Sequence, residues 1–262
     1  MQTRCYVGVL GAGLLAATNA VHAKHYFQVY GYGGPEQGET ELVAIIDHVT
    51  KSDLTMNYFD KTDIPVEGLT DYTLEFEYGI TDKWNTAVYF DWEQPKNEDL
   101  KYIQTRAVAA RYNFFNKGER FFDSGVYFEY YAPREAYLGG TDTKDTLEAR
   151  IILEKQYGRW DLRLNPIFEK VLSGTSVEEA MEFELAAGLY KSFSNHLSLG
   201  LEYYNGFGEI AKPANTDNQD RYVVPVVDYE VQKGFALHAG YAVGLTDASD
   251  DEVITTRFEV EL

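Results

Sequence analysis

The sequence predicts an all-β chain that folds as a single antiparallel transmembrane β-barrel of about twelve strands. Three observations support this fold class. Apolar and polar residues alternate with a period of two along most of the chain, short and long links between these runs alternate in turn, and the N-terminus has the layout of an export signal.

The first 23 residues are predicted to be a signal peptide. Arg4 supplies a positive charge, an apolar run from Tyr6 to Ala20 follows, and Val21-His22-Ala23 offers small residues at a cleavage site before Lys24. The run is too short for a typical membrane helix. The single cysteine, Cys5, would leave with the signal, so no disulfide is expected in the exported chain.

Charge and composition narrow the class of protein further. Removal of the signal leaves 22 Lys and Arg residues against 42 Asp and Glu residues, a net charge of −20, which repels nucleic acid and excludes it as a partner. No later apolar run is long enough for a membrane helix. Aromatic residues make up 15% of the chain, with 21 tyrosines, as expected for the two aromatic girdles of a membrane barrel.

Period-two alternation defines the predicted strands. In the clearest case, from Trp84 to Glu93, tryptophan, threonine, valine and phenylalanine lie on one face and polar residues lie mostly on the other. The predicted barrel occupies residues 39–262. Its strands are 39–50, 70–81, 84–94, 100–115, 121–133, 143–157, 158–172, 177–193, 195–207, 221–232, 233–246 and 251–262.

Link lengths predict which end of the barrel faces which compartment. Links after even-numbered strands are mostly tight, such as 81–83, 158–159 and 232–234, whereas the links 51–69 and 208–220 are long. Outer-membrane barrels have short periplasmic turns and longer extracellular loops. The chain is therefore expected in the cell outer membrane, with its long links outside.

Three places leave alternatives open. Arg106 and Arg111 have opposite parity in one strand, so either a bulge intervenes or one arginine faces outward. Pro225 implies a bulge or an unpaired position, because proline has no N–H group to donate. The segment 24–38 is expected to be a periplasmic tail or an insert in the lumen, rather than an additional strand.

A soluble β-sandwich or lipocalin-like barrel would also alternate, but with its apolar face inward. Alternation alone does not decide between the two. Strand length, girdle aromatics, the two classes of link and the signal peptide together favour the membrane barrel.

The run Leu74–Trp84 (LEFEYGITDKW) and the final residues Arg257–Leu262 carry a family resemblance. The first resembles a strand–turn–strand of Gram-negative small porins and outer-membrane transporters, in particular those grouped with phenol-degradation transporters. The second is similar to the C-terminal strand signal read by the barrel-assembly machinery, which implies that machinery as a partner. It departs from the signal by ending in Leu262 instead of phenylalanine.

If the apolar faces meet lipid, acidic residues must line the lumen, with a few arginines as partners. Such a lumen holds water or cations, because a dry interior cannot keep unpaired carboxylates ionised. The sequence thus predicts a porin-like channel for small neutral or cationic solutes. The alternative is a barrel that transports nothing and acts through its extracellular loops. The predicted lumen-lining residues are Glu75, Glu77, Asp91, Glu93, Glu129, Glu148, Arg150, Arg163, Glu169, Glu182, Glu184, Glu202, Asp228, Glu230, Arg257 and Glu259.

No enzyme, cofactor or metal site is predicted. His196, Ser198 and Glu202 share one strand face, but residues two apart on a strand are nearly 7 Å apart, too far for a catalytic triad. The acidic loop 247–252 matches no calcium-binding spacing. The remaining expected partners are outer-membrane lipid and lipopolysaccharide.

Overall fold

The computed structural model describes residues 27–133, 145–172 and 181–262, and within them twelve antiparallel strands close into one barrel. Around the barrel the order is β1, β14, β13 and so on down to β4, which pairs with β1. The barrel strands are β1 (Thr40–Lys51), β4 (Thr70–Thr81), β5 (Trp84–Gln94), β6 (Lys101–Asn113), β7 (Asp123–Pro133), β8 (Thr146–Tyr157), β9 (Trp160–Val171), β10 (Glu182–Ser192), β11 (Leu197–Glu209), β12 (Arg221–Gln232), β13 (Phe235–Gly244) and β14 (Glu252–Glu261).

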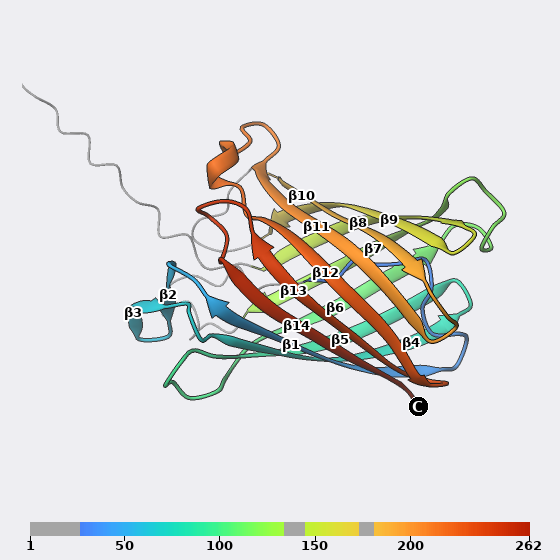
Figure 1. The fold of residues 1–262 in the computed structure, drawn as a ribbon, viewed down its shortest axis with the longest axis horizontal. Coiled ribbons are helices and arrows are strands. Elements are labelled where there is room, and N and C mark those ends of the chain that lie inside the picture. The colour runs from blue at the N-terminus through green and yellow to red at the C-terminus, as the bar shows by residue number, and fades with distance from the viewer. Residues whose placement is uncertain (1–26, 134–144, 173–180) are drawn as a thin grey trace, which may run out of the picture.

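The two ends of the barrel differ, as Figure 1 shows. One end, called the turn end here, carries the links 82–83, 158–159, 193–196 and 233–234, together with the C-terminus. The other, called the loop end, carries the links 52–69, 95–100, 210–220 and 245–251, although one longer link, 114–122, lies at the turn end. The link 52–69 is not a plain loop, because it contains a hairpin of β2 (Thr55–Tyr58) and β3 (Lys61–Pro65). No helix among the described residues is long and apolar enough to cross a membrane.

Most large apolar side chains of the barrel strands point outward, and most charged side chains point inward. Leu201 is 53% exposed and Ile254 is 42% exposed, whereas Glu75 and Glu202 are only 1% and 2% exposed. This is the reverse of a soluble barrel, in which the apolar rows would meet in the centre. The outer surface therefore suits contact with acyl chains.

Both irregular strands are explained by the register. Arg106 is paired with Tyr89 and Arg111 with Asn85, so five steps on β6 match four on β5, and a bulge brings both arginines inside. Around Pro225, the regular pairing of β12 with β13 breaks off at Val223 and resumes at Val226. Proline at this point costs no ladder bond to that neighbour.

Residues 27–38, called the N-terminal segment here, run through the lumen. Phe27 packs edge-on against Tyr204 and against Tyr222 near the loop end, with ring centroids 5.3 and 5.1 Å apart. At the turn end the backbone N–H of Gly38 donates to the carbonyl of Gly79 over 2.8 Å. Residues 24–26 lie outside the described residues, as does the predicted signal peptide.

The loop end of the lumen contains an apolar cluster that includes Phe27. Inward-facing valines of β1, β12 and β14 meet Met56, Tyr58 and Leu69 of the link 52–69 there. The hairpin β2–β3 extends past the barrel end in Figure 1, and its β2 side chains Met56 and Tyr58 anchor it to the barrel mouth by burial in this cluster.

Candidate functional site

Side chains of the barrel wall hold the N-terminal segment by its backbone. Asn165 accepts from the N–H of Tyr30 through Oδ1 (2.7 Å) and donates to its carbonyl through Nδ2 (3.1 Å). Glu154 Oε2 accepts from the N–H of Tyr32 over 2.7 Å. Asn165 is fully buried, so each bond replaces a solvent contact that this backbone has lost.

Near the turn end the same segment is held by three side chains of β5 and β6. Arg111 donates to the carbonyl of Gly31, Asn113 Nδ2 to the carbonyl of Tyr32 and Asn85 Nδ2 to the carbonyl of Pro35, each over 2.9 Å. These polar contacts satisfy an extended backbone that lacks strand neighbours.

The run Leu74–Trp84 needs a glycine at position 79 because another part of the backbone passes close to it. A Cβ atom at this position would lie 2.0 Å from the carbonyl oxygen of Glu36. The backbone of the N-terminal segment therefore crosses β4 at a distance that any side chain would prevent.

Three tyrosines fix the middle of the segment to one side of the lumen. The hydroxyl of Tyr30 lies 3.0 Å from that of Tyr89 and 3.4 Å from that of Tyr127, and Tyr89 and Tyr127 are 3.3 Å apart. The guanidinium of Arg150 lies 4.5 Å from the centroid of the Tyr30 ring, a cation–π contact. The segment thereby fills the side of the lumen next to β5–β8.

A buried ionic network strengthens this side of the barrel. Arg106 donates to Asp91 (Nε–Oδ2, 2.8 Å) and to Glu129 (Nη1–Oε1, 2.9 Å) and lies over the ring of Tyr89. Arg150 donates to Glu148 over 2.9 Å. Hydroxyl groups complete the network, because Thr73 donates to Asp91 and Tyr127 donates to Glu129.

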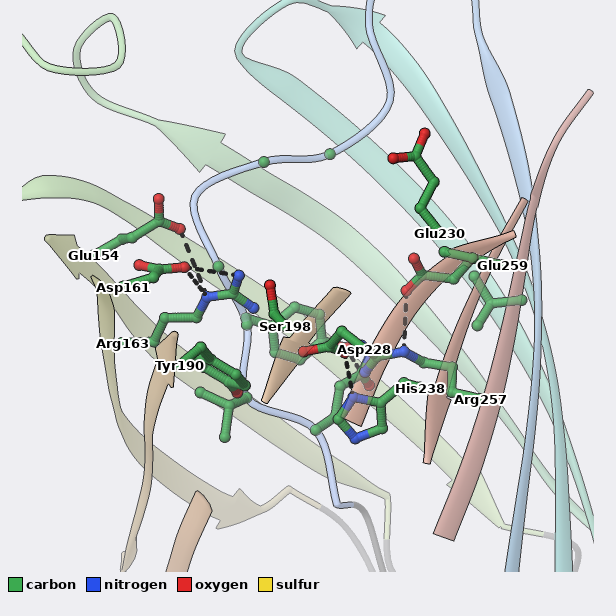
Figure 2. Close-up of a pocket in the computed structure, with 18 of the residues that line it drawn as sticks. Glu154, Asp161, Arg163, Tyr190, Ser198, Asp228, Glu230, His238, Arg257 and Glu259 are labelled. Carbon is green, nitrogen blue, oxygen red and sulfur yellow. Dashed lines mark hydrogen bonds and ion pairs between the residues drawn. The ribbon is translucent and has the colours of Figure 1, made fainter. Parts of the chain in front are cut away.

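The opposite side of the lumen holds a cavity of about 480 Å³. It lies between the N-terminal segment and the inner faces of β8–β14, β1 and β4. Figure 2 shows Arg163, Tyr190, Asp228, His238 and Arg257 pointing into it from β9–β14.

The cavity has an excess of negative charge. Eight carboxylates and four basic side chains line it, and each basic side chain is within 3.3 Å of a carboxylate. The four pairs are Arg111–Glu77, Lys117–Glu154, Arg163–Asp161 and Arg257–Glu259. Glu41, Glu75, Asp228 and Glu230 are the other acidic residues of the lining, so acidic groups outnumber the Lys and Arg side chains by four, and such a lining favours cations.

The structure separates the sixteen predicted lumen residues into three groups. The first group, on β4–β8, is buried in the barrel wall, and two of its members, Glu75 and Glu77, also line the cavity. Glu202 on β11 is buried as well. Arg163, Asp228, Glu230, Arg257 and Glu259 line the cavity. The third group, on β9 and β10 towards the loop end, has carboxylate oxygens within 4.8 Å of one another: Glu169, Glu182 and Glu184.

Several site residues were not anticipated from the sequence. Asn85, Asn113 and Asn165 hold the N-terminal segment, and their inward parity among outward apolar neighbours was the available signal. Arg106 and Arg111 were left undecided because a bulge is invisible to simple alternation. His238 lines the cavity and contacts Asp228, its partner across the hairpin of β12 and β13, and the register of that tight hairpin was the available signal.

The residues considered for a catalytic triad are not brought together. His196 is exposed, with Nδ1 3.6 Å from Glu230 Oε2. Glu202 is buried and accepts hydrogen bonds from Tyr190 and Tyr204 instead. The hydroxyl of Ser198 is 3.0 Å from that of Ser192.

No family model and no curated protein matches the sequence. Solved structures do match the fold. An outer-membrane channel of Pseudomonas putida F1 superimposes with a TM-score of 0.56 at 14% identity, over 88% of this chain and 98% of that one. The KdgM porin gives 0.54 at 8% identity, over 85% and 99% of the two chains.

A second porin, NanC, gives a TM-score of 0.50 at 7% identity, over 85% of this chain and 98% of its own. The chain folds as an outer-membrane β-barrel. At these identities the likeness establishes the fold, so the solute must be argued from the lumen of this barrel alone. The predicted relation to phenol-degradation transporters stays a prediction.

Proposed function

We propose that this protein is a narrow outer-membrane channel for small neutral or cationic solutes, which pass through the cavity beside the N-terminal segment. The observation that carries the proposal is the surplus of carboxylates in a cavity of about 480 Å³ inside a closed barrel. Carboxylates facing a narrow aqueous path attract cations and repel anions at close range.

The position of the N-terminal segment supports a path on one side. Asn165, Asn113 and Asn85 hold its backbone by hydrogen bonds, so the segment stays in a fixed place and narrows the lumen. Anionic solutes would meet Glu41 and Glu75 at this constriction. A neutral solute of suitable size has no such barrier.

Ion preference in a planar bilayer tests the proposal. Purified barrel is expected to conduct, with a reversal potential in a salt gradient that has the sign of cation preference. Glu230→Gln and Glu259→Gln replace partly exposed carboxylates of the cavity lining with little change in shape and should reduce that preference.

The matched control is Glu67→Gln. Glu67 is an exposed loop residue whose carboxylate lies 3.7 Å from Lys96, and this change should leave the preference unaltered. A membrane that stays silent at high protein load would contradict the proposal and favour a barrel that acts through its loops. Anion preference, or equal preference in all variants, would also contradict it.

A further inference from the structure

His238 lines the cavity, and one of its two ring nitrogens is buried. Its Nδ1 lies 2.7 Å from Asp228 Oδ1, and a carboxylate can only accept, so Nδ1 carries the hydrogen of this bond. The other ring nitrogen, Nε2, has no hydrogen-bond partner among the described residues, although the side chain is only 5% exposed. In Figure 2 the ring of His238 stands directly beside Asp228.

A second acceptor faces this nitrogen. Glu202 Oε1 lies 4.0 Å from His238 Nε2. Glu202 is held in place because Tyr190 donates to its Oε1 and Tyr204 to its Oε2, each over 2.6 Å. The two atoms are too far apart for a hydrogen bond, so the gap between them has room for a small bridging group.

We propose that His238 Nε2 and Glu202 Oε1 bind a divalent transition-metal ion such as Zn²⁺. Zinc lies about 2.0–2.1 Å from imidazole nitrogen and about 2.0–2.2 Å from carboxylate oxygen, so two such bonds span up to about 4.2 Å. The observed separation fits an open bridge. An inward shift of about 0.6 Å would bring the two ligands to a tetrahedral angle.

Asp228 completes the arrangement typical of a metal-binding histidine. Such histidines usually donate their second ring N–H to a carboxylate, which fixes the ring and raises the basicity of the ligating nitrogen. Arg257 is the neighbour of His238 on β14, and its charge is partly balanced by Glu259, 3.0 Å away. The carboxylate surplus of the cavity therefore still favours a cation here.

The ligand types define the class of ion. Imidazole with one carboxylate suits Zn²⁺, Cu²⁺, Ni²⁺ or Co²⁺, whereas Ca²⁺ and Mg²⁺ prefer shells of oxygen ligands. With two protein ligands, water would fill the remaining positions and the ion would exchange with solution. The proposed channel prefers cations in general, whereas this site would select among divalent ions by their affinity for imidazole nitrogen.

Zinc binding to the folded, full-length barrel in detergent micelles tests the inference. Calorimetric titration should show one Zn²⁺ bound per chain and no binding of Mg²⁺. His238→Asn keeps a donor for Asp228 but removes Nε2, and Glu202→Gln keeps one acceptor oxygen for the two tyrosines but removes the charge. Both changes should weaken zinc binding at least tenfold, and Asp228→Asn should weaken it by about tenfold.

His196→Asn is the matched control, because His196 is an exposed histidine that also lies beside a carboxylate. It should leave zinc binding unchanged. With Cu²⁺ in place of Zn²⁺, the electron paramagnetic resonance spectrum should show coupling to a nitrogen, and this coupling should disappear only in the His238 variant. Wild-type binding that persists in His238→Asn, or no zinc binding at all, would overturn the site. Binding is measured without ion flow, so its failure leaves the proposed channel untouched, and a silent channel leaves this site untouched.

Discussion

Replacing Arg106 by methionine tests whether the ionic network holds the barrel wall. Arg106 is 3% exposed and forms ion pairs with Asp91 at 2.8 Å and Glu129 at 2.9 Å. Removing one partner from a buried ion pair typically costs about 3–5 kcal/mol, because the remaining charge is left uncompensated. Thr73 and Tyr127 would still donate to the two carboxylates. We therefore expect a loss of about 3 kcal/mol in the free energy of unfolding.

Denaturant unfolding of the barrel in lipid vesicles, followed by tryptophan fluorescence, measures this loss. Arg159→Met, at an exposed turn, is the control and should change the stability by less than about 0.5 kcal/mol. Combining Arg106→Met with Asp91→Asn and Glu129→Gln removes the stranded charges and should restore most of the stability. Wild-type stability in Arg106→Met, or a triple variant as unstable as the single one, would refute the reasoning.

Three further outcomes are expected. Gly79→Val places a side chain against the backbone of the N-terminal segment, at a cost of about 1–3 kcal/mol, and should speed hydrogen exchange there; unchanged exchange would contradict the close approach. Asn165→Ala removes two hydrogen bonds to Tyr30 and should raise the single-channel conductance, which is measured in planar bilayers. The N–H and side-chain amide of Asn116 donate to Glu119 and lower the pKa of that carboxyl. The bonds therefore contribute stability above the ordinary pKa that is lost as pH falls through the lowered value, and Asn116→Ala should raise the pKa in an NMR titration.

The strands were predicted closely because alternation is a local property. The ranges 70–81 and 84–94 coincide with β4 and β5, and 221–232 coincides with β12. The hairpin β2–β3 was missed, since strands of four and five residues are too short for a clear period. Its burial depends on an apolar patch contributed by strands far away in the chain.

Parity also predicted which acids share the inward face of each strand, once lipid was assumed outside. Parity could not show which of these acids belong to the buried ionic network and which line the cavity. That division depends on where the N-terminal segment lies, and its place is set by Asn165, Glu154 and Arg111 on three different strands. No pattern within any one of these strands carries that information.

The sequence by itself determined the class of fold, the number of barrel strands and their approximate limits, because each depends on residues two positions apart. Only the tertiary structure decided that the N-terminal segment fills one side of the lumen and that His238, Asp228 and Glu202 meet on the other. Those contacts join strands through their register around the closed barrel, and register is a property of the whole sheet.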